Sequence, residues 1–109
     1  MEISFSKRHD ALIVSVAGRM DGVSAPEFDS KMEELFNQGE KGIVLNFERL
    51  EYMSSAGLRS ILLIAKKAKA AGGKVSCCAL QHMVKKVFDL AGFAGMIPVF
   101  DSLEDALNR

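Results

Sequence analysis

The sequence predicts an α/β fold with one mixed sheet of about five strands and about four helices, which lie mostly on one side of the sheet. Three observations lead to this prediction. Residues 42–47, GIVLNF, are apolar on nearly every position, as in a central parallel strand that is covered on both faces. Two segments with strand patterns precede this run. After it, helical and strand patterns alternate to the end of the chain.

The N-terminal segment predicts a β-hairpin. Residues 3–8 alternate apolar and polar side chains, and residues 11–17 continue as a second strand after His9 and Asp10. We expect the first strand to form an edge of the sheet. Residues 18–22, GRMDG, predict a turn at the end of the second strand.

A first helix is predicted from Ser24 to about Gln38. Residues 24–27, SAPE, form a capping-box pattern, and the proline falls in the first turn, where its missing N–H does no harm. Gly39 ends the helix. The side chains that share one helical face and would pack on the sheet are Phe28, Met32, Leu35 and Phe36.

The longest predicted helix follows the central strand. Either Ser54 or Ser55 could act as its N-cap, and Gly72-Gly73 ends it. Its sheet-facing stripe, extended by the stem of a lysine, consists of Leu58, Ile61, Leu62, Ala65, Ala68 and Lys69.

Two apolar residues of this helix fall outside that stripe. At about 100° per residue, Leu63 projects to the side of Arg59 and Lys66, where a monomer would leave it largely in water. Ile64 projects to the opposite flank. A single exposed leucine is ordinary, but Leu63 with its basic neighbours would extend a surface that begins at Ser55.

The C-terminal third predicts a strand at residues 74–80, a helix over residues 83–91, a short strand at residues 97–100 and a final helix. Pro98 favours an edge position for the short strand, because proline cannot donate to a ladder hydrogen bond. Ser102 and Asp105 have the spacing of a helix cap, so the final helix begins there.

Composition predicts one domain, residues 1–109, because 49% hydrophobic and 26% charged residues suit a single globular core. Fourteen acidic and fourteen basic residues balance, so we expect no direct binding of nucleic acid and no membrane partner. The N-terminus lacks an apolar signal region, and no stretch approaches the roughly 20 apolar residues of a membrane span. We therefore expect a cytoplasmic protein.

Cys77 and Cys78 are the two cysteines, and they are neighbours in a predicted strand. Their side chains therefore point to opposite faces and cannot form a conventional metal pair. We interpret them as small buried apolar residues. The sequence predicts no metal and no cofactor.

Ser54 and Ser55 are the candidate functional residues. A pair of hydroxyls at a helix N-terminus is commonly only a cap. Here, however, the pair lies at the carboxyl end of a strand, which is where open α/β sheets tend to place their sites. Asp21 also follows a strand and could lie beside them. It is either a turn residue that bonds to its own backbone or a part of the functional surface.

At these positions the chain resembles the bacterial anti-sigma factor antagonists, which are single STAS domains. The resemblance spans nearly the whole chain and rests on GRMD, GIVLNF, the junction YMSSAGL and the segment VKKVFDLAGF. It implies a STAS-like mixed sheet. In this family the serine that follows an aspartate at the junction is phosphorylated, and that serine corresponds to Ser55. Ser54 replaces the aspartate and Ala56 replaces the second hydroxyl, which makes Ser54 a competing acceptor.

The resemblance implies a protein-binding switch. The partner would be an anti-sigma factor that is also a serine protein kinase of the histidine-kinase-like ATPase type. The unphosphorylated chain would bind this partner and free a sigma factor for transcription, and a serine phosphatase would reset the switch. The expected partner surface comprises Asp21, Ser54, Ser55, Ala56, Gly57, Arg59 and Leu63.

Two rival functions are weighed against this one. An enzyme is disfavoured because Met53 stands at the first glycine position of a G-x-S-x-G elbow. His9 and His82 fall at a hairpin turn and a helix start, so nothing places either beside Ser55 as a base. The chain has no phosphate loop or dinucleotide fingerprint. A STAS scaffold or regulatory module in another partner-switching assembly remains open.

Overall fold

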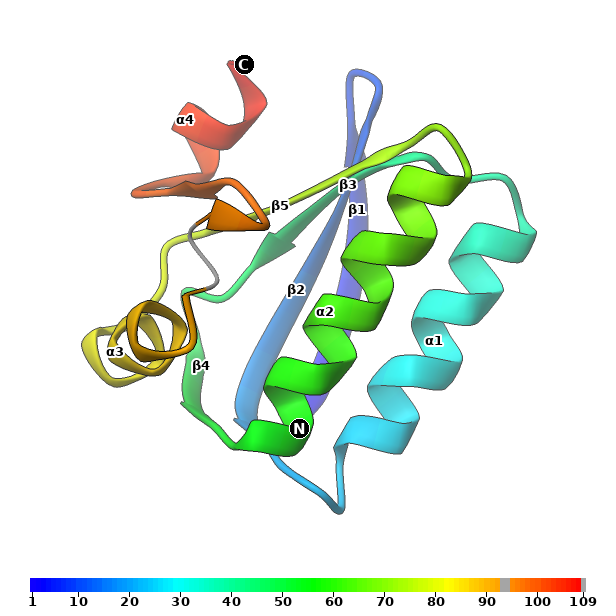
Figure 1. Ribbon diagram of the computed structural model, residues 1–109. Coiled ribbons are helices and arrows are strands. Elements are labelled where there is room, and N and C mark those ends of the chain that lie inside the picture. The colour runs from blue at the N-terminus through cyan, green and yellow to red at the C-terminus, as the bar shows by residue number, and fades with distance from the viewer. Residues whose placement is uncertain (93–94, 109) are drawn as a thin grey trace.

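The computed structural model describes residues 1–92 and 95–108 (Figure 1). Its strands are β1 (Glu2–Arg8), β2 (Ala11–Met20), β3 (Gly42–Asn46), β4 (Leu50–Met53), β5 (Lys74–Cys78) and β6 (Val99–Phe100). Its helices are α1 (Ala25–Asn37), α2 (Ser55–Ala70), α3 (His82–Leu90) and α4 (Leu103–Leu107). Phe93, the last residue of VKKVFDLAGF, lies outside the described residues. The predicted order of elements is confirmed, with β4 as an additional strand.

The strands form one mixed sheet in the order β1-β2-β3-β5-β6, and β4 pairs with β2 beyond the end of β3. β1 and β2 pair antiparallel, which confirms the hairpin and the edge position of β1. All other pairs are parallel, and β3 lies at the centre as predicted. The carboxyl ends of β2 and β4 therefore meet at one edge of the sheet.

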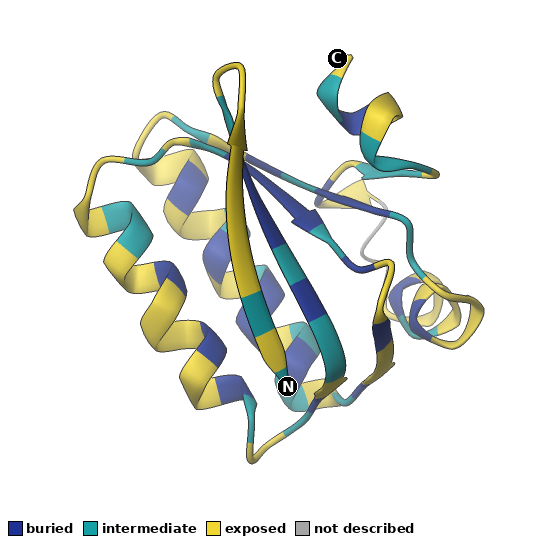
Figure 2. Ribbon diagram, turned by 180° about the vertical axis from the view of Figure 1, so that it is seen from behind, coloured by how far each residue is buried: buried dark blue, intermediate teal, exposed yellow. Residues whose placement is uncertain are grey.

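The main core lies between the sheet and the helices α1, α2 and α3, and it includes Phe28, Phe47 and Ile61. α1 and α2 lie side by side over this face (Figure 1). α4 covers part of the opposite face, much of which is open when the molecule is seen from behind (Figure 2). A second, smaller cluster that holds α4 consists of Val44, Cys78 and Ala106. None of the described helices is suited to crossing a bilayer.

The two cysteines lie on opposite faces of β5, as predicted. Cys77 belongs to the main core and Cys78 to the cluster under α4, and both are free and buried. Burial raises the pKa of the Cys78 thiol to about 11 and also raises the pKa of Cys77. Neither residue supplies a thiolate at neutral pH, which agrees with their interpretation as apolar core residues.

Three local predictions are wrong. Residues 18–20 are the end of β2 and not a turn, because β4 pairs alongside them. Ser24 does not cap α1 with its side chain, because its hydroxyl donates instead to the carbonyl of Arg19. Ile64, which the sequence places off the core stripe of α2, is buried in the core, because the Met32 side of α1 packs against that flank of α2. Leu63, by contrast, is 50% exposed, as predicted.

The apolar stripe of α2 differs in detail from its prediction, and that of α3 is narrow. Met83 and Leu90 of α3 are exposed, because this helix contacts the core only through a narrow stripe around Val84 and Phe88. In α2 the half-buried Leu58, Leu62 and Ala65 flank the buried stripe. That stripe consists of Gly57, Ser60, Ile61, Ile64 and Ala68.

Candidate functional site

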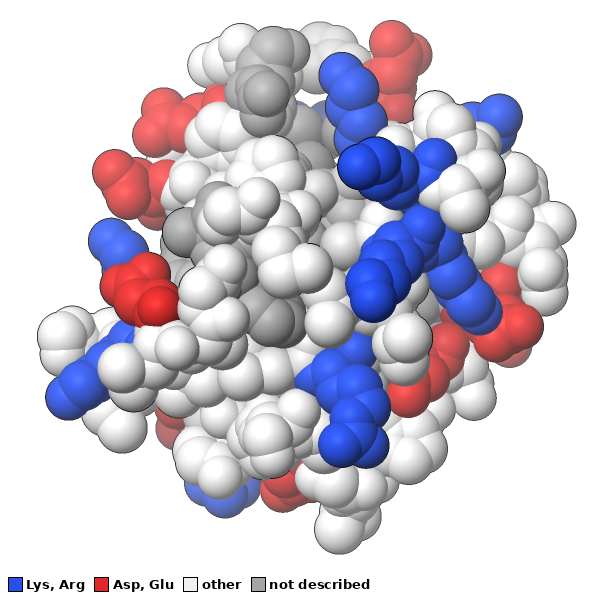
Figure 3. Space-filling model, viewed as in Figure 1, with Lys and Arg blue, Asp and Glu red and all other residues white. Residues whose placement is uncertain are grey.

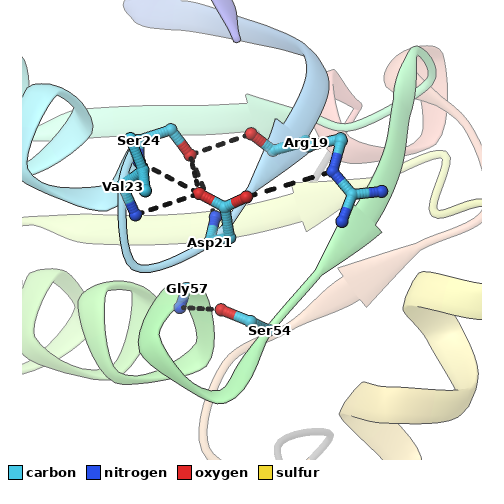
Figure 4. Close-up of polar contacts among 6 residues, drawn as sticks. All are labelled: Arg19, Asp21, Val23, Ser24, Ser54 and Gly57. Carbon is cyan, nitrogen blue, oxygen red and sulfur yellow. Dashed lines mark hydrogen bonds and ion pairs between the residues drawn. The ribbon is translucent and has the colours of Figure 1, made fainter.

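The candidate site lies where β2 and β4 end and α2 begins (Figure 1). The backbone N–H of Ser54 donates to the carbonyl of Met20 at 2.9 Å. This bond ties the start of α2 to the residue before Asp21, so the two loops lie together (Figure 4). The site therefore occupies the carboxyl edge of the sheet, where open α/β folds tend to bind their ligands.

Ser54, and not Ser55, is the N-cap of α2. Its backbone is extended, with φ -90° and ψ 177°, and its Oγ accepts a hydrogen bond from the N–H of Gly57 at 3.4 Å. Ser54 is half-buried, whereas Ser55 is exposed. Within the described part of the chain, the Ser55 hydroxyl has no hydrogen-bond partner. The cap and the free hydroxyl are thus on different residues.

Gly57 brings the start of α2 close to the sheet. A Cβ at this position would lie 2.9 Å from Met53 Cγ and 3.1 Å from both Cγ and the carbonyl oxygen of Met20. These separations are shorter than ordinary van der Waals contact, so glycine permits the close approach of the helix to β2 and β4. Gly57 is buried. Its part in partner binding stays a prediction.

Asp21 forms an Asx turn at the end of β2 (Figure 4). Its Oδ1 accepts hydrogen bonds from the N–H groups of Val23 and Ser24, at 3.0 and 3.1 Å. The backbone hydrogen bond from Ser24 is the main cause that lowers the pKa of Asp21 below its ordinary value, so the carboxylate is charged at neutral pH. The turn role of Asp21 is therefore confirmed, and a partner-binding role stays a prediction.

Ser24 completes this turn through its hydroxyl. The hydroxyl oxygen accepts a hydrogen bond from the N–H of Asp21 at 2.9 Å, and the hydroxyl donates to the carbonyl of Arg19 at 2.9 Å. Both bonds run back toward β2, so the loop is closed on itself. This geometry explains why Ser24 does not cap α1.

Arg19 and Tyr52 form an exposed pair beside the site that the sequence analysis missed. They are register partners in the β2–β4 pairing, and the guanidinium carbon of Arg19 lies 4.2 Å from the centroid of the Tyr52 ring. Arg19 Nε also lies 3.9 Å from Asp21 Oδ2. The pair holds a positive charge next to the Asp21 turn. Its sequence signal is weak, because residues 19 and 52 become neighbours only once β4 is recognised.

The outer face of α2 continues the site away from the sheet. Arg59 lies one helical turn after Ser55, and Leu63 lies two turns after it; all three residues are exposed. Figure 3 shows basic side chains gathered over this helix. Those exposed on α2 are Arg59, Lys66, Lys67 and Lys69.

A groove of about 250 Å³ lies between α1 and α2, next to Leu63. Its apolar lining comes from Met32, Phe36, Leu63 and Ile64, and its polar lining from Asp29, Glu33 and Lys67. Lys67 Nζ and Glu33 Oε2 are 3.3 Å apart across the two helices.

The seven predicted site residues fall into three groups by exposure. The exposed residues are Ser55, Arg59 and Leu63; the half-buried ones are Asp21, Ser54 and Ala56; the buried one is Gly57. Within the described ranges, no group of three histidine, cysteine or acidic side chains could hold a metal ion. The arrangement is an exposed surface along α2 with the free hydroxyl of Ser55 at its start.

Comparison with known proteins agrees with this architecture. The STAS domain family model matches residues 2–106. The Bordetella bronchiseptica protein BtrV, which is named as an anti-sigma factor antagonist, is 34% identical over 106 residues, covering 97% of this chain and 91% of BtrV.

Two solved structures share the fold. A Thermotoga maritima protein named as an anti-sigma factor antagonist superposes with a TM-score of 0.92 at 20% identity, covering 97% of this chain and 92% of its own. SpoIIAA, an anti-sigma factor antagonist solved in unphosphorylated and phosphorylated forms, gives a TM-score of 0.84 for the unphosphorylated form at 23% identity, covering 99% of this chain and 95% of SpoIIAA. These likenesses show the fold alone. Together with the family match and the identity to BtrV, they lead to the conclusion that the chain belongs to the STAS domain family.

Proposed function

We propose that this chain is an anti-sigma factor antagonist, a binding protein and not an enzyme, whose binding is switched off by phosphorylation of Ser55. The observation that carries the proposal is the exposed Ser55 hydroxyl at the first position of α2, which is left free because Ser54 serves as the cap. The names of BtrV and SpoIIAA support the functional class.

The two serines differ in how readily they could accept phosphate. Ser54 is half-buried, and its Oγ already accepts the hydrogen bond from Gly57. Modification there would disturb a cap that is worth roughly 1 kcal/mol. The Ser55 hydroxyl can enter a kinase active site without breaking a described contact. We therefore assign Ser55 as the acceptor and Ser54 as its competitor.

The fold can hold a phosphate at Ser55. A phosphoserine carries roughly −1.5 to −2 charges. The N–H groups of the first helical turn and the helix dipole favour an anion at this end, and Arg59 lies one turn further along the same face. The phosphorylated chain would therefore keep its fold.

A partner surface packed over Ser55 could not hold the same charge. Burying an uncompensated charge costs several kcal/mol. Since each ~1.4 kcal/mol is tenfold in affinity, phosphorylation would weaken binding by roughly a hundredfold or more. The partner would be an anti-sigma factor that is also a serine kinase of the histidine-kinase-like ATPase type. The unmodified chain would hold it and free the sigma factor, and a serine phosphatase would restore binding.

The residues around Ser55 would also contact the partner. Arg59 would meet acidic groups of the partner, and Leu63 with the groove beside it would take an apolar side chain. Arg19 and Tyr52 lie at the border of the same surface and present an exposed cation–π pair.

Phosphorylation by the cognate kinase with ATP tests the proposal directly. Intact-mass and fragment mass spectrometry would be applied to the parent chain and to the Ser54→Ala and Ser55→Ala variants. We expect one phosphate on the parent and on Ser54→Ala, and none on Ser55→Ala. Phosphate on the Ser55→Ala variant would overturn the assignment of the acceptor.

A STAS scaffold is the second candidate, and the replacement of the junction aspartate by Ser54 and of the second hydroxyl by Ala56 favours it. A kinase that binds the parent chain and phosphorylates another substrate, yet leaves the parent unmodified, would decide for the scaffold. The same phosphorylation experiment with the cognate kinase therefore tests both functions.

A further inference from the structure

The strand β1 is an open edge of the sheet. It pairs with β2 on one side, and every residue of β1 except Ile3 is exposed. Figure 2 shows β1 along the front of the molecule, with exposed residues over most of its length. Phe5 is 44% exposed, although large aromatic side chains are mostly buried in folded proteins.

The backbone alternation of β2 shows which groups of β1 point outward. The N–H of Gly18 donates to the carbonyl of Arg49, on the β4 side of β2. The backbone N–H and C=O groups of the even-numbered β2 residues therefore point toward β3 and β4, and those of the odd-numbered residues point toward β1. The β1 register partners of those odd-numbered residues are Glu2, Ser4, Ser6 and Arg8. The N–H and C=O groups of Ile3, Phe5 and Lys7 therefore point away from the sheet.

We propose that β1 pairs antiparallel with β1 of a second copy, with Phe5 opposite Phe5 on the two-fold axis. In this register all seven residues of β1 find a partner. The outward backbone groups fall into the hydrogen-bonded pairs Phe5 with Phe5 and Ile3 with Lys7, as antiparallel pairing requires. A shift by two residues in either direction keeps this alternation but leaves an end of each strand unpaired.

The side chains of β1 complement themselves in the same register. Glu2 faces Arg8 of the second copy at both ends of the paired strands, so unlike charges meet. Charged residues on an edge strand often prevent pairing. Here the symmetric arrangement turns them into attractive cross-strand pairs, and Phe5 supplies an aromatic pair at the centre.

Contacts within each copy prepare the charged residues for this arrangement. Lys7 Nζ lies 3.1 Å from Glu40, which leaves its stem to cover Ile3 of the second copy. Arg8 Nη1 lies 2.9 Å from Glu104, so its guanidinium would bridge Glu104 and Glu2 of the second copy. Because the strands are antiparallel, the two Ser55 sites would lie at opposite ends of the dimer, and both would stay open.

Sedimentation velocity from about 1 μM to about 1 mM, with any N-terminal tag removed, tests self-association. We expect concentration-dependent dimer formation by the parent chain. When each is measured by itself, the Glu2→Arg and Arg8→Glu variants should dimerise at least about tenfold more weakly than the parent chain, because like charges then face each other. An equimolar mixture of the two variants should recover the association, because unlike charges meet again at both ends. A parent chain that stays monomeric, or a mixture no tighter than its components, would overturn the proposal.

Disulfide trapping tests the register. Antiparallel hydrogen-bonded residues have Cα atoms about 5.5 Å apart, which is within the range of a disulfide. A Phe5→Cys variant should form a covalent dimer under mild oxidation, whereas a Ser4→Cys variant should form much less, because Ser4 faces Ser6 of the second copy. The native cysteines are buried and do not interfere. Equal trapping at both positions would refute this pairing.

Discussion

An aspartate in place of Ser55 should separate the binding surface from the fold. Ser55 is exposed and its hydroxyl has no described hydrogen-bond partner, so the substitution breaks no contact within the described chain. The helix dipole favours a carboxylate in the first turn by about 0.3–1 kcal/mol, and Arg59 four residues later adds about 0.2–0.5 kcal/mol. We expect the Ser55→Asp variant to melt at the temperature of the parent or slightly above it.

The same charge should weaken binding to the anti-sigma factor. Covering an uncompensated carboxylate costs several kcal/mol, and we take about 3 kcal/mol here because Arg59 and the first N–H groups of α2 offset part of the charge. This corresponds to a loss of more than about a hundredfold in affinity. Isothermal titration calorimetry with the purified partner measures the loss, and thermal melting followed by circular dichroism measures the stability.

The Ser55→Asn variant is the matched control. Asparagine has nearly the size of aspartate but no charge, so we expect its affinity to stay within about threefold of the parent. If Asn and Asp weaken binding equally, the effect is one of size and the charge argument is wrong. If Ser55→Asp unfolds the domain at moderate temperature, Ser55 is a structural residue and the argument for a switch loses its basis.

Three further predictions concern the surroundings of Ser55. Leu63→Ser should weaken partner binding by about tenfold with little change in melting temperature, because this side chain is half in water; a large loss of stability with binding intact would place Leu63 in the core. Gly57→Ala should lower the melting temperature, because overpacking strain of about 1–3 kcal/mol exceeds the gain of up to about 1 kcal/mol in helix propensity; an unchanged melting curve would contradict the close packing on Met20. Asp21→Asn should destabilise the chain more at pH 7 than at pH 3. The folded pKa of Asp21 is lowered, so its contribution is fully present above the unfolded pKa of about 3.9 and declines as the pH falls toward and through the folded value; an equal difference in melting temperature at both pH values would refute this.

The sequence predicts most of the fold because its strongest patterns are long. The continuous apolar run of β3 reflects burial on both faces, and the structure confirms it. The alternation of β1 predicts the strand correctly but not its burial, because every residue of β1 except Ile3 is exposed. β4 is different, because it has four residues with two exposed ones between two buried ones, a pattern that neither alternates nor runs apolar. Missing β4 also hides the Arg19–Tyr52 pair, since only strand pairing brings these residues together.

Ile64 shows the limit of a helical-wheel argument. The wheel assumes that a helix is buried on one side only, by the sheet. α2 is buried by the sheet and also by α1 on one flank, so its buried arc is wider than the stripe of Ile61 and Ala68. The sequence does not show which flank has the neighbouring helix, so it could predict exposure correctly for Leu63 and not for Ile64.

The neutral cap at Ser54 determines how a phosphate would change the charge of the site. Arg19 and Arg59 contribute two positive charges beside Ser55, and Asp21 contributes one negative charge, so their sum is +1. The Asp21 carboxylate is also held by hydrogen bonds from the N–H groups of its own turn. A phosphate of roughly −2 would turn this sum to about −1. An aspartate at position 54 would have reduced this sum to zero before any phosphorylation. With serine there, modification of Ser55 would reverse the sign of the surface, so a partner with acidic groups opposite Arg59 would be repelled rather than merely held less tightly.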